Sequence, residues 1–255
     1  MLLFERFNLG HGFRKYFQID PALDDALRDD VYRIRHEVYC EDLGFEPVRP
    51  DRLESDEYDA HSAHCLLRTS SEPMQLVGCT RLVLTKPGDR SCPLPFENTC
   101  AATLDRSIVD PARLPRETIA EVSRLAVRAA YRRRRGESRT SPLIRDEDFG
   151  TNNQPRFPYI PISLYLGALA LAERHGIETV FMLTEPRLAV HLARLGVDVR
   201  QIGDAVEHRG SRIPSMMNVK SIIQGMRFML KPMWTTIREE IQGPYAGKGV
   251  DAHLT

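Results

Sequence analysis

Residues Thr118–Arg128 read TIAEVSRLAVR, and this stretch decides both the fold and the candidate site. Its apolar residues alternate well enough with polar ones to predict a β-strand. Glu121 and Arg124 lie in the middle of that strand, where burying a charge without a partner is costly. They are three residues apart, so a regular strand places them on opposite faces, whereas a β-bulge between them brings both to one face. The pattern fits either a strand with one solvent-exposed face or a bulged strand beside an active site.

The surrounding pattern predicts a mixture of helices and strands. A helix is expected to begin at Asp20-Pro21, because Asp is a good N-cap and Pro suits the first turn, and its apolar spacing continues to Val38. Strands are expected at Ala63–Thr69 and Gln75–Thr85, the second with Arg81 inside it. In the second half of the chain, the pattern predicts helices at Ile160–His175 and Pro186–Leu195 and strands at Glu178–Thr184, Val197–Ile202 and Ala205–Arg209. It also predicts a helical C-terminal extension at about 219–242 that Pro232 kinks or breaks. This order indicates an α/β or α+β sheet with helices on both faces.

Composition narrows the class of protein. The chain has 255 residues, 42% of them hydrophobic, and a formal net charge of zero. It is long enough to bury a substantial core, and its composition excludes a disordered chain. The zero charge argues against a globally basic nucleic-acid-binding protein, so no nucleic-acid partner is expected. The five cysteines are an odd number without a C-x-x-C pair, which indicates reduced thiols in a cytoplasmic protein, with no disulfide framework and no metal site.

The zero charge hides two segments of opposite sign. Residues Asp20–Asp59 hold 14 acidic and 5 basic residues, whereas Arg113–Arg145 holds 10 arginines and 3 glutamates. The acidic segment includes LESDEYD, in which Asp56 and Asp59 are suited to hold a cation such as a substrate ammonium group. Either two solvated faces or one site that needs both signs is consistent with this separation.

Four segments, in order and at compatible spacing, resemble the acyl-homoserine lactone synthases. They are YRIRHEVYCEDLGF, ESDEYD, GCTRL and EVSRLAV, and they cover roughly residues 30 to 130. The later segments TEPRLAVHLARLG and GDAVEHRGSRIPS resemble the acyltransferases associated with PEP-CTERM/exosortase systems, which are similar to N-acyl amino acid synthases. The resemblance implies the GNAT fold, an α/β (α+β) architecture with a central, mixed, V-splayed sheet flanked by helices. It implies one such domain over residues 1–255.

The resemblance also implies roles for individual residues. Glu121 is the expected general base, directly or through water, with Ser123 and Arg124 beside it at the catalytic centre. The expected substrate-binding residues are Arg35, Tyr39, Phe45, Asp56, Asp59 and Arg81. The expected acyl-donor-binding residues are Leu125, Ala126, Val127, Arg133, Arg134, Arg135 and Gly136, of which Arg133 and Gly136 approximate the GNAT phosphate loop. Lactone synthases usually carry Phe and Trp where this chain has Tyr39 and Phe45, so the product need not be a lactone.

The expected function is transfer of a fatty acyl group from an acyl thioester to the amine of an amino acid or related small molecule. The co-substrate is acyl-ACP or acyl-CoA, with no tightly bound cofactor, and an acidic acyl carrier protein would suit the arginines at 132–135. One alternative is an S-adenosylmethionine-dependent acyl-homoserine lactone synthase. Another is a non-catalytic module that binds membrane or carrier protein. The Met- and Trp-rich C-terminal segment fits peripheral contact with the inner membrane face, a cover for the core, or a grip on an acyl chain.

Overall fold

The computed structural model describes residues 8–132, 150–151, 154–155 and 158–247. Within these ranges, eight strands form a sheet in the order β1-β2-β3-β4-β7-β10-β8, and β9 pairs with β10. The strands are β1 (Phe17–Pro21), β2 (Ser62–Thr69), β3 (Leu76–Leu84), β4 (Ile119–Val127), β7 (Thr179–Thr184), β8 (Arg200–Gln201), β9 (Val206–Glu207) and β10 (Ser211–Asn218); β5 (Gly150–Thr151) and β6 (Gln154–Pro155) form a separate pair. The α-helices are α2 (Leu9–Tyr16), α3 (Asp25–Arg35), α4 (Pro95–Thr99), α5 (Ala129–Arg132), α6 (Tyr159–Arg174), α7 (Pro186–Arg194), α8 (Val219–Gly225) and α9 (Lys231–Gly247).

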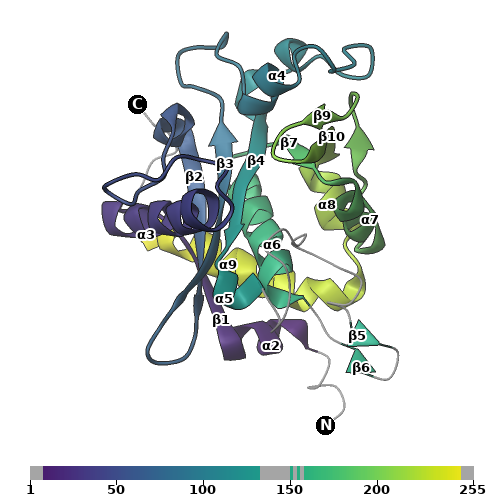
Figure 1. Cartoon of the computed structure of the whole chain (residues 1–255). Coiled ribbons are helices and arrows are strands. Elements are labelled where there is room, and N and C mark those ends of the chain that lie inside the picture. Colours follow the sequence, from purple (N-terminus) through teal and green to yellow (C-terminus); the bar gives the residue numbers. More distant parts are fainter. Residues whose placement is uncertain (1–7, 133–149, 152–153, 156–157, 248–255) are drawn as a thin grey trace.

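The sheet opens between its two central strands. β4 and β7 are parallel and pair only from Ile119 to Glu121, whereas the other strand pairs of this sheet are antiparallel. β4 then continues to Val127 without β7 beside it, and the two strands diverge (Figure 1). The expected mixed, splayed sheet flanked by helices is confirmed. Glu121 lies where the pairing ends.

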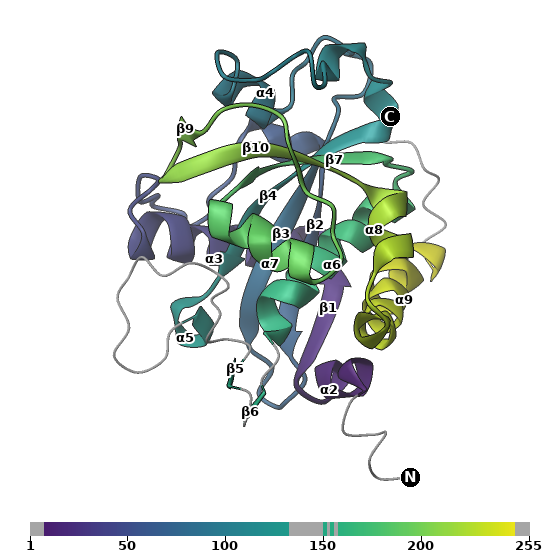
Figure 2. The same cartoon turned by 90° about the vertical axis from the view of Figure 1, so that its right-hand side faces the viewer.

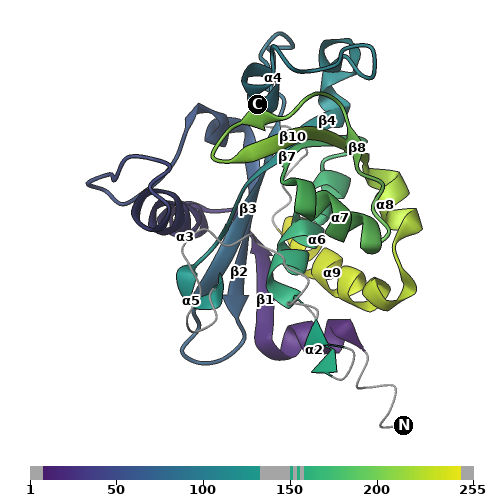
Figure 3. The same ribbon diagram turned by 45° about the vertical axis from the view of Figure 1, so that its right-hand side comes forward.

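Helices cover the two faces of the sheet unequally. α3 packs on one face of β2, β3 and β4, and α6 and α9 pack on the other (Figure 3). α6 is apolar on nearly all sides, as expected for a helix enclosed between a sheet and another helix. The apolar residues of the C-terminal segment, including Met233, Trp234 and Ile237, are buried in the same core. They therefore cover the core, whereas Phe228 and Met229 stay 86% and 52% exposed.

No helix in the described ranges has the length and apolar composition that crossing a membrane requires.

The helix expected from Asp20 begins later than its sequence predicts, and α2 (Leu9–Tyr16) precedes it. Asp20-Pro21 belongs to β1, and the Asp20 carboxylate pairs with Arg68 of β2. The helix instead begins at Asp25, because the Asp24 side chain accepts a hydrogen bond of 2.9 Å from the Leu27 backbone N–H. Asp20 and Asp24 are both good N-cap residues, but Asp20 pairs with β2, so Asp24 caps the helix.

The C-terminal third differs most from its predicted pattern. The strands expected at 197–202 and 205–209 are present only as the two-residue strands β8 and β9. The sequence pattern predicts no strand where β10 lies. Pro214 in β10 lacks the N–H that a central strand normally uses, so its presence argues against a strand when only the sequence is considered. Its carbonyl still accepts a hydrogen bond from the Ile202 N–H at 2.9 Å. The expected break in the C-terminal helix is present, but it precedes Pro232, which lies in the first turn of α9.

The N-cap of α3 offers a test of this fold. We expect Asp24→Ala to lower the free energy of unfolding by about 1 kcal/mol, since it leaves the Leu27 N–H without its cap. Asp29→Ala, a change within the same helix, is the matched control and should stay within about 0.5 kcal/mol of the parent. Urea unfolding followed by circular dichroism measures both. Equal effects of the two substitutions would contradict an α3 start at Asp25.

Candidate active site

A β-bulge shapes the middle of β4. Cys79 and Arg81 on β3 pair with Ala126 and Ser123 on β4, so two steps on β3 face three steps on β4. Arg124 in the bulge has a φ of 50°, a left-handed conformation that is rare for a residue with a side chain. With the extra residue, Glu121 and Arg124 line the same cavity. The bulged interpretation of TIAEVSRLAVR is therefore confirmed.

Two cavities meet at this strand. The larger, here called the polar cleft, holds about 900 Å³ between the segment with Tyr39 and Phe45, strand β4, and the β9–β10 turn. The smaller, here called the apolar pocket, holds about 70 Å³ between the sheet and helices α6, α7 and α8. Three residues line both of them: Val122, Tyr165 and Met182.

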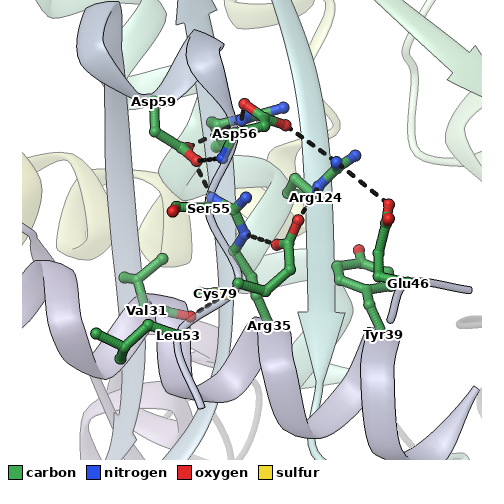
Figure 4. A network of polar contacts seen from close by, with 12 residues as sticks. Val31, Arg35, Tyr39, Glu46, Leu53, Ser55, Asp56, Asp59, Cys79 and Arg124 are labelled. Carbon is green, nitrogen blue, oxygen red and sulfur yellow. Dashed lines mark hydrogen bonds and ion pairs between the residues drawn. The ribbon is translucent and has the colours of Figure 1, made fainter. Parts of the chain in front are cut away.

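Arg35 anchors a network of ion pairs beneath the polar cleft. Its side chain is completely buried at the end of α3. Its Nε donates to Glu54, and its Nη1 donates to Asp59 Oδ1 at 2.7 Å (Figure 4). Glu54 and Asp59 are themselves 2% and 5% exposed, so this part of the network is closed to solvent.

Arg81 and Arg124 extend the network to the wall of the cleft. Arg81 Nη1 donates to Asp56 Oδ1 at 2.6 Å and to Asp59 Oδ1 at 2.9 Å, and its Nε donates to Ser123 Oγ at 3.1 Å. Arg124 Nη2 donates to the other Asp56 oxygen at 3.0 Å (Figure 4). The network therefore joins α3, the loop before β2, β3 and β4.

The pKa values of the two aspartates reflect these contacts. Burial by itself raises the pKa of Asp59, but the hydrogen bond and charge of Arg35 and the charge of Arg81 outweigh it, so the pKa falls well below its usual range. At Asp56 burial also acts upward, and the hydrogen bond and charge of Arg81 more than offset it. Both carboxylates are ionised at neutral pH and committed to arginines of the protein. The role expected for them from the sequence, holding a substrate ammonium group, stays a prediction with strong competition from these partners.

Glu121 is the buried carboxylate that the arginine network leaves unpaired. Its side chain lines the polar cleft, and its Oε2 accepts a hydrogen bond of 2.7 Å from the Phe96 backbone N–H. Burial raises its pKa from 4.5 to about 7, although the Phe96 N–H and the charges of Arg81 and Arg124 oppose the rise. A carboxylate with this pKa can take up and release a proton near neutral pH.

Tyr39 and Phe45 come from the segment that follows α3 and line the polar cleft beside β4. The Tyr39 hydroxyl donates to the Leu125 carbonyl at 2.9 Å, and burial raises its pKa to about 12, so it stays protonated. Its ring lies under two guanidinium groups, with Arg124 Cζ at 5.7 Å and Arg209 Cζ at 5.9 Å from the ring centroid. Phe45 lines the cleft and is 36% exposed.

The expected donor-binding residues divide into three groups. Leu125 and Val127 line the polar cleft, and their role in binding the donor stays a prediction. Ala126 is 1% exposed and packs beneath α3 in a cluster with Val31 and Ile34, so it faces away from the cleft. Arg133, Arg134, Arg135 and Gly136 lie outside the described residues.

Sequence reasoning missed the far side of the cleft. Arg209, in the turn between β9 and β10, forms an ion pair with Glu46, which follows the helical segment that carries Tyr39. His208 and Arg212 from the same turn also line the cleft. The segment GDAVEHRGSRIPS, which contains these three residues, was a signal through its resemblance, but nothing local shows what Arg209 meets. In the part of the chain that the structure describes, no three His, Cys, Asp or Glu side chains gather as a metal site would require.

The network predicts a stability effect for Asp59. Asp59→Asn leaves two buried guanidinium groups short of a carboxylate, so we expect the free energy of unfolding to fall by about 3–5 kcal/mol. Asp30→Asn, which breaks an exposed pair with Arg33 on α3, is the matched control and should cost under about 1 kcal/mol. Urea unfolding at pH 7 measures both. An Asp59→Asn protein of parental stability would show that the carboxylate is free for a substrate instead.

The raised pKa of Glu121 predicts that removal of this carboxylate stabilises the protein, whereas removal of the Asp59 carboxylate destabilises it. The size of the effect depends on pH. The folded protein holds a proton on Glu121 up to about pH 7, whereas the unfolded chain releases it near pH 4.5. Glu121 therefore contributes a penalty that grows as pH rises from about 5 to 7 and is complete above it. We expect Glu121→Gln to raise the free energy of unfolding at pH 8 by up to about 3 kcal/mol and to change it little at pH 4. Unfolding curves at several pH values test this, and a pH-independent effect would contradict it.

Comparisons with known proteins find similar sequences. Residues 34–141 match the family model described as the acetyltransferase (GNAT) domain. An acyl-homoserine-lactone synthase from Pseudomonas fluorescens is 24% identical over 196 residues, which span 75% of this chain and 80% of that protein.

Solved structures show the same fold. The acyl-homoserine lactone synthase LasI matches with a TM-score of 0.54 and 21% identity, over 82% of this chain and 93% of its own. BjaI, a CoA-dependent acyl-homoserine lactone synthase solved with S-adenosylmethionine and isopentyl-CoA, matches with a TM-score of 0.53 and 21% identity, over 87% and 89%. FeeM, an N-acyl amino acid synthase from uncultured soil microbes, matches with a TM-score of 0.51 and 16% identity, over 82% and 95%. The expected GNAT-like fold is confirmed, and the comparisons support an enzyme of the acyltransferase class similar to these two kinds of synthase.

Proposed function

We propose that this protein is an N-acyltransferase that moves a fatty acyl group from an acyl thioester to the amine of an amino acid or related small molecule. One observation carries the proposal. Glu121 is a buried carboxylate without an arginine partner, its pKa is about 7, and it lies where β4 leaves β7 in a cleft that adjoins an apolar pocket. This arrangement supplies a proton acceptor beside a wall that separates polar from apolar space.

The two cavities suit the two ends of the reaction. The apolar pocket, lined by residues such as Ile162, Leu169 and Met217, offers apolar walls to the first few carbons of a hydrocarbon chain at its volume of about 70 Å³. The polar cleft suits the amine acceptor and the polar part of the thioester. A thioester carbonyl placed near Val122 and Tyr165, which line both cavities, would have its chain on one side and the amine on the other.

The chemical step needs no covalent enzyme intermediate. The amine nitrogen attacks the thioester carbonyl carbon, the new C–N bond forms, and the C–S bond then breaks to release the thiol. Glu121 accepts the amine proton, directly or through water, and can return it to the departing thiolate. The bulge removes Arg124 and Leu125 from the β3–β4 register, and we take the backbone N–H groups of this part of β4 to meet the oxyanion. The arginine network fixes this wall.

The proposal extends to the acyl donor and to the place where the enzyme acts. Acyl-ACP and acyl-CoA both carry the thioester, and arginines 132–135 favour the acidic carrier protein; Arg132 also pairs with Asp42 at 3.1 Å. We take the whole chain to act as one domain in the cytoplasm, and peripheral membrane contact stays a prediction. The finer resemblance to acyltransferases of PEP-CTERM/exosortase systems also stays a prediction from the sequence.

A second candidate is an S-adenosylmethionine-dependent acyl-homoserine lactone synthase. The 24% identical relative favours it. Tyr39 and Phe45, in place of the Phe and Trp usual in those synthases, favour a different acceptor. The same comparisons weigh against a non-catalytic binding module.

One assay separates these candidates. Purified protein is mixed with long-chain acyl-ACP or acyl-CoA and a pool of the twenty amino acids, with or without S-adenosylmethionine, and products are identified by mass spectrometry. We expect N-acyl amino acids, and a kcat/KM that rises with pH and levels off above about 7 as Glu121 loses its proton. Glu121→Gln should lower kcat/KM by about 10²–10⁴-fold.

Glu117→Gln changes an exposed carboxylate near the start of β4 and is the matched control, expected to behave like the parent. A lactone formed only with S-adenosylmethionine would instead assign the second candidate. The absence of any acylated product, or a Glu121→Gln variant as active as the parent, would refute the N-acyltransferase.

A further inference from the structure

The arginines expected from the sequence to meet an acceptor are already occupied. Arg35 and Arg81 are 0% and 1% exposed, and Glu54, Asp56 and Asp59 take their hydrogen bonds. Arg35 Nη2 has no partner but is buried outside the cleft lining, and Arg81 and Arg124 reach the cleft while they are held by Asp56. Recognition of an anionic group in the acceptor therefore falls to another cation.

Arg209 is placed for that role. It lines the polar cleft, its side chain is 23% exposed, and its guanidinium lies over the Tyr39 ring. Its hydrogen bond to Glu46 uses Nη2, and a guanidinium has five N–H donors in a planar fork, so donors remain for a second anion. Glu46 is 22% exposed, which makes the contact one that an incoming carboxylate can replace.

The backbone holds Arg209 in an unusual conformation. Its φ is 56°, and Gly210 follows with a φ of 97°, so the turn between β9 and β10 is built on two left-handed residues. A left-handed arginine costs free energy and persists only where the surroundings fix it. Figure 2 shows β9 and the adjoining end of β10 on the same side of the molecule as α3, and Arg209 in the turn between them pairs with Glu46 of the segment after α3.

The charge around the cleft favours an anionic ligand. Its lining includes five arginines, at 81, 124, 132, 209 and 212, but three carboxylates, Asp56, Glu121 and Glu185. Protonation of Glu121 increases the positive excess. Burial, followed by the charges of Arg212 and Arg35, lowers the pKa of Arg209, so an added anion would stabilise its charged form. Arginines that line the cleft in this number can attract a carboxylate.

We propose that Arg209 binds the carboxylate of the acceptor by exchanging Glu46 for it, so that the acceptor is an amine that carries a carboxylate, such as an α-amino acid. The inference rests on the proposed N-acyl transfer and names the acceptor class of that site. A bidentate guanidinium–carboxylate pair over an aromatic ring is the geometry in which arginine differs most from lysine.

The test is a specificity ratio. Initial rates are measured with one long-chain acyl-ACP and two matched acceptor pools, the α-amino acids and their carboxamides, which keep the amine and lose the charge. The parent should favour the amino acids. Arg209→Gln should lower the ratio of kcat/KM, amino acid over carboxamide, by about 10- to 100-fold, as expected for loss of a charge-assisted hydrogen bond.

If Arg209→Gln does not fold, two other variants and a control still test the role of Arg209. Arg209→Lys keeps the charge and loses the fork, so the ratio should fall by an intermediate amount. Glu46→Gln removes the competing carboxylate, so the KM for amino acids should fall several-fold. Arg200→Gln, at an exposed position on β8 outside the cleft, should leave the ratio at the parental value.

The outcomes separate this inference from the proposed function. If the parent acylates carboxamides as well as amino acids, or if Arg209→Gln keeps the parental ratio, N-acyl transfer stands and the role of Arg209 is refuted. A rise in the KM for the acyl donor at an unchanged ratio would assign Arg209 to the donor and also refute it. If neither pool yields an amide, the proposed function itself fails.

Discussion

Two guanidinium groups with almost no access to water, those of Arg35 and Arg81, set the constraint on which the rest of the site depends. Burial of such charges is tolerated only when carboxylates meet them with good geometry. Asp59 accepts hydrogen bonds from both, and Glu54 and Asp56 complete the set. Because these residues come from α3, the loop before β2, and β3, the need to satisfy two charges fixes three segments against β4.

The same constraint explains why one buried carboxylate behaves differently from the others. Asp59 and Glu121 are both nearly inaccessible to solvent, yet the pKa of Asp59 is lowered and that of Glu121 is raised to about 7. Two arginines contact Asp59, whereas Glu121 receives a backbone N–H from Phe96. Environments that push two carboxyl groups apart in pKa assign them different tasks. Asp59 holds the architecture together, and Glu121 is left able to exchange a proton.

Local sequence could predict one side of this site but not the other. The alternation of β4 and the charges inside it pointed to Glu121 and Arg124, and the ordered motifs pointed to the residues of the network. Periodicity could not show that Asp56 and Asp59 are engaged by arginines, since those partners lie 22 to 68 residues away along the chain. The contact between Glu46 and Arg209 spans 163 residues, and Pro214 disguises the strand that positions the turn.

The charge pattern of the chain takes on a different meaning once these contacts are known. Most of the carboxylates of the acidic loop and the arginines of the network neutralise one another within the wall of the cleft. What faces the open space is a base without a cation, Glu121, and a cation with a replaceable anion, Arg209. An amino acid carries an amine for the first and a carboxylate for the second. S-adenosylmethionine carries the same two groups, so these two contacts define an acceptor with an amine and a carboxylate, and the rest of the acceptor is recognised elsewhere in the cleft.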